Sequence, residues 1–303
     1  MNIDKQEVAV EFRNLTKFYG KSLGVQDLSF AVQPGEVFGF LGPNGAGKTT
    51  AMRALMGLIT PTSGQAFVFG VDVTNAAPEY RADIGYLPGV FDAYKNMTGK
   101  EFLDFVANMR GVDCSEYVAD LTARFDLDLS RQISTLSKGN RQKLGVIQAF
   151  MHKPRVLILD EPTSGLDPLV QHEFEKLLAE SKDRGAAIVL SSHVLSEVEH
   201  LADRVAILHK GQLQLVEHIS VLKQQAVRTI EVSLIRKATE SDFDYIPGID
   251  DLRIFENRVT CNLTGEVTKF LELITTFGVE SIHTYEPSLE DIFLSLIPQE
   301  GAR

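Results

Sequence analysis

Three short runs of almost continuous apolar residues constrain the fold of this chain most strongly. They are VFGFL at 37–41, VLILD at 156–160 and AIVLSS at 187–192. Strands that are apolar on both faces are typical of parallel sheets covered by helices on both sides. Helical patterns fall between the strand candidates, so the sequence predicts an α/β fold around a parallel sheet.

Strand and helix patterns alternate over roughly the first 220 residues. The strand candidates are 8–12, 37–41, 66–69, 156–160, 187–191 and 205–208, and the helix candidates are 48–58, 138–151, 169–181 and 195–202. From Tyr86 to Met151 the strand pattern disappears. Phe102, Phe105 and Met109 recur there at helical spacing, which predicts a helical insertion at about 86–150.

After about residue 222 the pattern changes. RTIEVSLI at 228–235 and RVTCNL at 258–263 alternate with a period of two, and VTKFLELITTF at 267–277 has a helical pattern. Residues 281–285 are a further strand candidate, and 288–297 form a helix candidate capped by Ser288. The sequence therefore predicts a main domain at 1–221 and a small C-terminal α+β domain at 222–303.

Composition excludes several classes of protein. The chain has 30 Lys plus Arg and 41 Asp plus Glu, a net charge of −11 that disfavours nucleic acid as a partner. Cys114 and Cys261 lie far apart, which fits a reducing cytosol better than a disulfide scaffold. No apolar run approaches the ~18–20 residues that cross a bilayer, and MNIDKQEVAVEF at 1–12 lacks the apolar core of a signal peptide. A cytoplasmic protein is expected, with any spanning helices on a partner.

The segment GPNGAGKT at 42–49 fits the pattern of a phosphate-binding loop. It lies between a buried strand pattern and a helix pattern, as such a loop requires. Its glycines let backbone N–H groups surround phosphate oxygens without a Cβ in the way, and the helix N-terminus adds partial positive charge. We expect Lys48 to reach the β- and γ-phosphates and the Thr49 hydroxyl to bind Mg²⁺.

An acidic pair, Asp160 and Glu161, ends the apolar run at 156–160. An Asp at the carboxyl end of a central parallel strand lies at the edge of the sheet where ligands bind, and it can hold Mg²⁺. Glu161 is then placed to orient or deprotonate a water near the γ-phosphate. Taken alone, the pair fits the capping of a turn equally well, and the neighbouring phosphate loop favours the catalytic interpretation.

The segment TLSKGNRQKLGVIQAFM at 135–151 begins a helix, with Ser137 as a candidate N-cap and Gly139 in the bare first turn. Such a helix start forms a second anion site. One nucleotide does not need two such sites in one domain, which favours a head-to-tail dimer with the second site covering the partner's γ-phosphate. An ordinary capped helix is the alternative for this segment taken by itself.

Together these segments resemble the ATP-binding cassette (ABC) transporter ATPases over about residues 6–220. The motifs are GPNGAGKTT at 42–50, LSKGN at 136–140, VLILDEP at 156–162, SGLD at 164–167 and the His of SSH at 191–193, in the family's order. This combination is highly specific. The resemblance implies a P-loop NTPase fold that binds ATP and Mg²⁺ and hydrolyses ATP.

The resemblance also implies a role for each matched position. The ATP-binding positions are Tyr19, which would stack on adenine, and Gly42, Pro43, Asn44, Gly45, Ala46, Gly47, Lys48, Thr49 and Thr50. The signature positions, which would contact the ATP of the partner subunit, are Ser137, Lys138, Gly139 and Asn140. Lys138 and Asn140 replace the commoner Gly and Gln. Asp167 matches the loop that crosses the dimer interface, and Glu161 and His193 match the catalytic positions. Thr49 and Asp160 match the Mg²⁺ ligands.

One position departs from the family pattern. A Gln usually follows the segment of the type IGYLP, but here IGYLP at 84–88 is followed by Gly89. Gly89 has no amide side chain to reach Mg²⁺ or the attacking water, so this role cannot be assigned to position 89. We therefore expect slower or less metal-sensitive hydrolysis.

The resemblance implies an ATP-hydrolysing subunit of an ABC transporter. It would work as a head-to-tail dimer, with itself or a homologous ATPase, bound to a separate transmembrane permease on the inner face of the cell membrane. EPSLEDIFL at 286–294 resembles the tail of cassette proteins of drug, antibiotic or sodium exporters, which points to export. A dimerisation or regulatory role fits the C-terminal domain equally well.

Two other functions remain open from the sequence. One is a soluble cassette ATPase of translation or DNA repair, which is disfavoured by the single phosphate loop and by the short spacing of 137 − 48 = 89 positions between Lys48 and Ser137. The other is a regulatory subunit that binds ATP and hardly hydrolyses it. Gly89 favours that alternative, whereas Glu161 and His193 oppose it.

Overall fold

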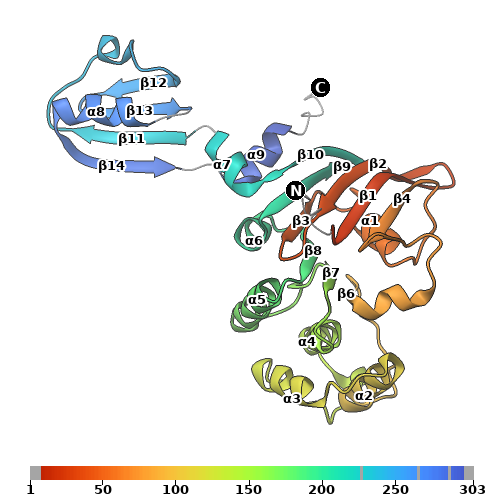
Figure 1. The fold of residues 1–303 in the computed structure, drawn as a ribbon. Helices are drawn as coiled ribbons and strands as arrows, with labels where there is room; N and C mark the ends of the chain where they lie inside the picture. Colours follow the sequence, from red (N-terminus) through yellow and green to blue (C-terminus); the bar gives the residue numbers. More distant parts are fainter. Residues whose placement is uncertain (1–7, 226–227, 265–266, 286–287, 297–303) are drawn as a thin grey trace, which may run out of the picture. The chain divides into compact units, whose positions relative to one another are not determined.

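The computed structural model describes residues 8–225, 228–264, 267–285 and 288–296 (Figure 1). The chain divides into two compact units, 1–216 and 217–303. The sequence analysis set the boundary between residues 221 and 222 instead, within a helical segment of the second unit. The assignment of these units as domains stays a prediction.

The first unit contains a ten-stranded sheet in the order β5-β4-β1-β2-β10-β9-β3-β8-β7-β6 (Figure 1). The strands are β1 (Val10–Tyr19), β2 (Ser22–Val32), β3 (Val37–Leu41), β4 (Ser63–Val68), β5 (Val71–Asp72), β6 (Ile84–Leu87), β7 (Val156–Asp160), β8 (Ala187–Ser191), β9 (Arg204–His209) and β10 (Gln212–His218). Strands β6, β7, β8, β3 and β9 pair in parallel, whereas β1 pairs antiparallel with β2 and β4.

The predicted α/β fold with a parallel core is confirmed. The three apolar runs form the adjacent strands β3, β8 and β7, and all five residues of each are buried. The antiparallel strand β2 was not predicted, because its register against β1 shifts at several places and its buried residues do not alternate. Strand β1 extends to Tyr19, beyond the predicted end at residue 12.

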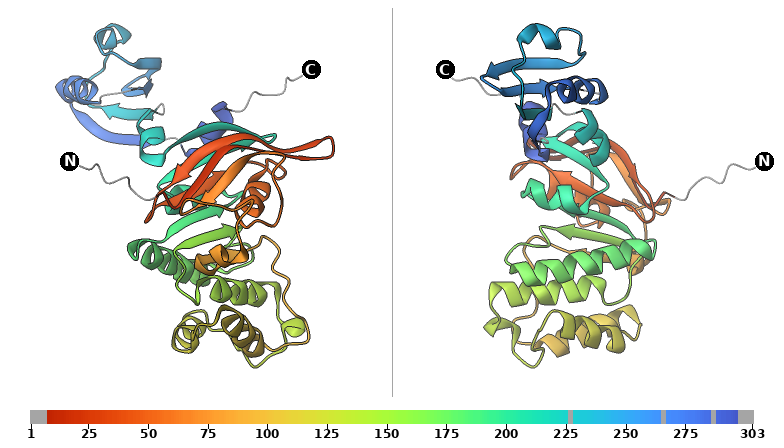
Figure 2. Two further views of the ribbon diagram at one scale, coloured as in Figure 1. Left: turned by 45° about the vertical axis from the view of Figure 1, so that its right-hand side comes forward. Right: turned by 90° about the vertical axis from the view of Figure 1, so that its left-hand side faces the viewer.

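The described part of the first unit also contains α-helices. They are α1 (Lys48–Leu55), α2 (Gly99–Arg110), α3 (Ser115–Arg124), α4 (Lys138–Phe150), α5 (Pro168–Asp183) and α6 (Leu195–Leu201). Short 3₁₀ segments, η1 (Pro78–Asp83) and η2 (Ile133–Thr135), precede β6 and α4. Helices α2, α3 and α4 lie together at one end of the unit, opposite the antiparallel strands, as the predicted helical insertion requires (Figures 1 and 2).

The start and end of α2 follow from its sequence. Thr98 and Glu101 form a reciprocal capping box at the start, and Gly111 ends the helix in the left-handed conformation. Phe102 is buried, whereas Phe105 is 36% and Met109 72% exposed. The helix was predicted correctly, but its buried face is narrower than the apolar spacing suggested.

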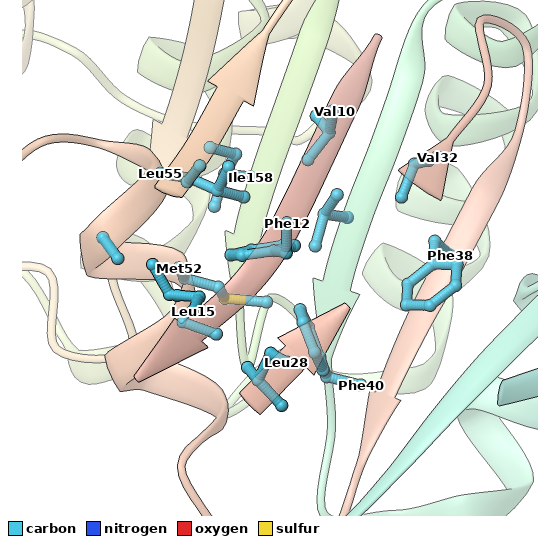
Figure 3. Close-up of a cluster of buried hydrophobic side chains, with 14 of the residues drawn as sticks. Val10, Phe12, Leu15, Leu28, Val32, Phe38, Phe40, Met52, Leu55 and Ile158 are labelled. Carbon is cyan, nitrogen blue, oxygen red and sulfur yellow. The ribbon is translucent and has the colours of Figure 1, made fainter. Parts of the chain in front are cut away.

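A cluster of buried aromatic and aliphatic side chains fixes α1 against the sheet (Figure 3). Phe12 of β1 and Phe40 of β3 pack edge to face, and the ring of Phe30 stacks on that of Phe38 at a centroid distance of 4.7 Å. Met52 of α1 belongs to the same cluster and is fully buried. Burying such side chains stabilises each by about 1.5–3 kcal/mol, so the loop that precedes α1 is held on a rigid base.

Two helix ends of the helical insertion are attached to the start of β6. Arg110, the last residue of α2, donates to the carbonyl oxygens of Ala82 (3.0 Å) and Ile84 (3.1 Å). His152, just after α4, contacts the Ile84 oxygen through Nε2 at 3.2 Å. Because a carbonyl oxygen only accepts, Nε2 carries the proton in this contact. The insertion is thereby tied to the strand that leads to Gly89.

The second unit is a four-stranded antiparallel sheet with helices. Its strands are β11 (Arg228–Leu234), β12 (Ile249–Phe255), β13 (Arg258–Leu263) and β14 (Val279–Tyr285), in the order β12-β13-β11-β14. Its helices are α7 (Ile219–Gln225), α8 (Thr268–Phe277) and α9 (Leu289–Leu296), with a 3₁₀ segment η3 (Glu240–Phe243). Phe270 of α8 packs with Phe243 over the sheet. The predicted α+β architecture is confirmed, including Ser288 at the start of α9.

We expect His152 to make stability depend on pH. Burial and the charge of Arg110 lower the pKa of His152 to about 4, although its hydrogen bond to the Ile84 carbonyl oxygen acts in the opposite direction. Between about pH 6.5 and pH 4, His152 is protonated in the unfolded chain but stays neutral in the folded chain. The free energy of unfolding therefore decreases as pH falls from 6.5 to 4. The full effect is about 3 kcal/mol. Urea unfolding at pH 7 and pH 5 measures the effect. The free energy of unfolding should fall less for His152→Gln than for the parent, and equal losses would contradict the lowered pKa of His152.

Candidate active site

The loop between β3 and α1 contains two glycines, Gly42 and Gly47, at which neighbouring backbone leaves no room for a Cβ. Gly42 has φ +150, and a Cβ there would lie 2.3 Å from the carbonyl oxygen of Leu208. Gly47 has φ +109, and a Cβ there would lie 2.5 Å from the carbonyl oxygen of Gly24. The loop thus packs directly against neighbouring backbone, with its N–H groups at the start of α1, where an anion is stabilised.

Lys48 spans this loop from the first turn of α1. Its Nζ donates to the carbonyl oxygens of Gly42 (2.6 Å) and Pro43 (3.3 Å), and only 6% of the residue is exposed. Burial lowers the pKa of Lys48, while the carboxylates of Glu161 and Asp160 act in the opposite direction. Because the Lys48 ammonium is largely removed from water, an anionic ligand beside it would stabilise its charge strongly.

Two hydroxyl groups converge on the carboxylate of Asp160. Thr49 Oγ1 donates to Oδ2 at 2.7 Å, and Ser191 Oγ donates to Oδ1 at 2.5 Å. These side chains come from α1, β7 and β8, whose ends meet because β3, β8 and β7 are parallel neighbours. A hydroxyl and a carboxylate are oxygen ligands that Mg²⁺ prefers, so the pair of Thr49 and Asp160 fits a magnesium ion.

Glu161 and His193 form a second pair beside the first. His193 Nδ1 donates to Glu161 Oε2 at 2.6 Å, and the His193 backbone N–H lies 3.4 Å from the same oxygen. The Glu161 backbone has φ +53, and its N–H is shared between the carbonyl oxygen and the hydroxyl of Ser191. A left-handed backbone at a non-glycine residue is strained and persists only where surrounding contacts hold it.

A cavity of about 420 Å³ brings most of the predicted nucleotide residues together. The predicted residues that line it are Tyr19, Asn44, Gly45, Ala46, Gly47, Lys48, Thr49, Thr50, Asp160 and Glu161. Tyr19 ends β1 at the rim of the cavity, is 46% exposed, and has the Lys17 ammonium 5.3 Å from its ring centroid. Gly42 and Pro43 lie outside the lining and contribute the carbonyl oxygens that hold Lys48.

The signature residues lie outside this cavity, on the same face as the SGLD segment. Ser137 caps α4 by accepting from the Asn140 N–H at 3.2 Å. Lys138 Nζ lies 3.4 Å from Ser164 Oγ, and a Cβ at Gly139 would lie 2.8 Å from the Gly165 carbonyl oxygen. Ser137 and Lys138 are exposed, so the start of α4 is accessible to another molecule.

Asp167 has a structural task within its own chain. It caps α5 by accepting from the N–H groups of Leu169 and Val170, both at 3.1 Å. Asp167 is exposed and Leu169 is 82% exposed. The start of α5 therefore exposes both a charged residue and an apolar residue.

Gly89 lies against the acidic residue that fits the metal. A Cβ at position 89 would come within 3.1 Å of Asp160 Oδ2 and 3.3 Å of its Cγ, closer than most real Cβ contacts. Gly89 also lines the cavity, together with Pro88 and Val90. The absence of a side chain lets the backbone of this segment approach the Asp160 carboxylate directly.

Several residues of the site were missed by the sequence analysis. Gln142 donates from Nε2 to the carbonyl oxygens of Glu161 (3.2 Å) and Pro162 (2.9 Å) and so supports the acidic pair from α4. Arg53 and Tyr86 line the cavity, where burial and the charge of Asp160 raise the pKa of Tyr86, opposed by Arg53. No local motif marks these residues, since their contacts depend on which strands become neighbours.

Comparison with known proteins agrees with this geometry. Residues 25–164 match the family model described as ABC transporter. The bacitracin transport ATP-binding protein BcrA of Bacillus licheniformis is 36% identical over 301 residues, which cover 95% of this chain and 97% of that protein. The chain belongs to the ABC transporter family. It is an ATP-binding subunit of the kind that hydrolyses ATP, as the resemblance implied.

Solved structures support the same fold for this ABC subunit. An ATP-binding subunit of an ABC transporter superposes with a TM-score of 0.68 at 32% identity, covering 72% of this chain and 92% of that chain. A dimeric bacterial ABC transporter cassette superposes with a TM-score of 0.64 at 20% identity, covering 69% and 98%. The predicted P-loop NTPase fold is confirmed.

No described helix of this subunit is both long and apolar enough to span a bilayer. The described residues also hold no group of three or more His, Cys, Asp and Glu side chains that could bind a metal ion.

We expect Gly47→Ala to weaken ATP binding by at least about tenfold, because a Cβ must displace the backbone of Gly24 and adopt an unfavourable φ. Gly45→Ala is the matched control: φ is +81 there, but a Cβ would meet nothing within 4 Å. Titration with a fluorescent ATP analogue compares the two variants. Equal dissociation constants for Gly47→Ala and the parent would refute the tight packing of this loop.

Proposed function

We propose that the cavity beside Lys48 binds the phosphates of ATP and that Glu161 promotes attack by water on the γ-phosphate. The observation that carries this proposal is the convergence of Lys48, Thr49, Asp160 and Glu161 on one cavity from segments far apart in the sequence. The loop at 42–47 holds the β- and γ-phosphates through backbone N–H groups, and Tyr19 at the rim stacks on the adenine.

The Glu161–His193 pair performs the proton chemistry in this proposal. Glu161 is 20% exposed at its side chain, so it reaches water at the cavity while its backbone is held by Ser191. His193 donates to the carboxylate and keeps it oriented. The Glu161 carboxylate accepts a proton from the attacking water, while His193, which is 57% exposed, contacts the γ-phosphate.

The site also suits Mg²⁺. Thr49 Oγ1 and Asp160 Oδ2 are the oxygen atoms that would hold the ion. When bound, the ion neutralises charge on the β- and γ-phosphates. Ser191 contributes indirectly, because its hydrogen bond fixes the second oxygen of the Asp160 carboxylate.

The signature segment acts on a second nucleotide in the proposed dimer. Ser137, Lys138, Gly139 and Asn140 lie outside their own cavity, and the exposed start of α4 suits an anion from another subunit. A head-to-tail pair of cassettes places each start of α4 over the other subunit's γ-phosphate, with Asp167 at the interface. A solved cassette of the same fold is dimeric, which supports this arrangement.

The membrane-spanning part of the transporter is a separate permease in this proposal, and the subunit binds it on the inner face of the membrane. The helical insertion, attached to β6 through Arg110 and His152, transmits movement from Gly89 to that partner. The relative named for bacitracin transport favours export of an antibiotic-like compound. The motif at 286–294 lies partly outside the described residues.

We expect Glu161→Gln to lower the ATPase rate by about 10²–10⁴ while ATP binding persists, because the amide cannot accept the proton from water. The variant should accumulate as a nucleotide-bound dimer. Lys48→Ala is the matched variant that loses nucleotide binding. Steady-state ATPase assays, nucleotide titration and size-exclusion chromatography distinguish them, and normal hydrolysis by Glu161→Gln would overturn the role of Glu161.

We expect Gly89→Ala to raise the Mg²⁺ concentration needed for half-maximal ATPase activity by about tenfold, because the added Cβ pushes on the Asp160 carboxylate. Gly89→Gln adds the same Cβ and an amide that can reach the metal, so it should need less Mg²⁺ than Gly89→Ala. Magnesium titration of both variants tests this. Parent-like curves for both would mean that position 89 does not influence the metal site.

A further inference from the structure

Glu197 of α6 joins the two segments that carry the catalytic pair. Its Oε2 accepts from Thr163 Oγ1 at 2.7 Å and from Ser192 Oγ at 2.9 Å. Thr163 lies two residues after Glu161, and Ser192 directly precedes His193. Glu197 itself does not line the nucleotide cavity. It therefore bonds to the catalytic segments from outside the cavity lining.

The hydroxyl groups of Thr163 and Ser192 are buried, and both donate their hydrogen bond to the Glu197 carboxylate. Thr163 is 7% and Ser192 2% exposed. A hydroxyl has one proton to donate, and here both protons go to the same oxygen of Glu197. Removing that oxygen would leave two buried donors without an acceptor, which is more costly than the loss of exposed hydrogen bonds.

The bond to Ser192 also fixes the backbone around His193. Ser192 Oγ accepts from the Val194 N–H at 2.9 Å while it donates to Glu197. A continuous chain of donors therefore runs across His193, from Val194 through Ser192 to Glu197. This chain holds the turn that directs the imidazole toward Glu161.

The two catalytic segments are thus tied together twice. On the cavity side, His193 Nδ1 bonds to Glu161 Oε2. Behind it, Thr163 and Ser192 bond to Glu197. The bond on the cavity side joins the two groups that act on water and on the γ-phosphate in the proposed function, whereas the bonds to Glu197 join residues outside the cavity lining. Glu161 has a strained backbone, so its geometry depends on contacts of this second kind.

We infer that Glu197 is a positioning residue for ATP hydrolysis, which holds the segments of Glu161 and His193 in register during the reaction. This inference rests on the proposed roles of Glu161 and His193. It assigns to α6 a function in the chemical step, beyond its packing against β3.

The test compares Glu197→Ala with Glu197→Gln. The alanine removes the acceptor for both hydroxyls, so we expect kcat to fall about ten- to a hundredfold, as small misplacements in active sites do, with KM for ATP unchanged. The glutamine keeps one carbonyl oxygen that can accept both bonds, so its kcat should stay within about threefold of the parent. If Glu197 had only a structural role, Glu197→Ala would lower thermal stability without lowering kcat selectively at unchanged KM.

Ser196→Ala, at an exposed neighbouring position on α6, is the matched control and should behave as the parent. If Glu197→Ala does not fold, Thr163→Val and Ser192→Ala each remove one donor and should each lower kcat. Parent-like kcat in Glu197→Ala, or in both of these variants, overturns the inference. If Glu161→Gln is inactive while Glu197→Ala is normal, only the positioning role fails. If Glu161→Gln is active, the proposed role of Glu161 fails.

Discussion

The carboxylate of Asp160 is the point where the three central parallel strands are joined at their carboxyl ends. One oxygen accepts from Thr49, which follows β3, and the other accepts from Ser191, the last residue of β8. Asp160 and Ser191 are direct register partners in the sheet. A shift of one strand by one residue would turn its side chain at this pair to the other face of the sheet, so the proposed metal site depends on the strand register.

A cluster of buried apolar side chains from β1, β2, β3 and α1 supports this junction. Buried Phe38 and Phe40 of β3 pack with Phe12 and Phe30, and α1 contributes Met52 and Leu55 to the same cluster. Lys48 and Thr49 lie at the start of that helix and Met52 one turn later. The Thr49 hydroxyl is therefore placed by the same helix whose other side packs into the core.

Much of the site could be read from the sequence, because its residues occur in contiguous motifs next to strand and helix patterns. The loop at 42–49, Asp160 and Glu161 belong to this group. Contacts made across the fold could not be read. Gln142 supports Glu161 from a helix 19 residues away, and Glu197 holds hydroxyls of two different connections. These partners are chosen by strand order and helix packing, which no local pattern specifies.

Strand β2, in the antiparallel part of the sheet, could not be predicted from the sequence for a different reason. Strand β2 pairs with β1 through several register shifts, and bulged strands lose the period of two on which sequence analysis relies. Positive-φ residues such as Asn14 and Asp27 mark those irregularities, and both types tolerate the left-handed conformation. The irregularities that shape β2 therefore also remove the alternating pattern by which a strand is predicted.

The charges of the cavity explain why the proposed dimer would respond to ATP and not only to adenine. One buried ammonium, Lys48, faces two carboxylates, Asp160 and Glu161, so a third phosphate brings its negative charge close to like charge. Mg²⁺ and backbone N–H groups offset part of that repulsion. The exposed start of α4, with Ser137 and Lys138, has positive potential that its own cavity does not use. A second subunit that brings this helix start to the γ-phosphate is favoured most when that phosphate is present. Cleavage and then release of the phosphate remove the charge that holds the two surfaces together.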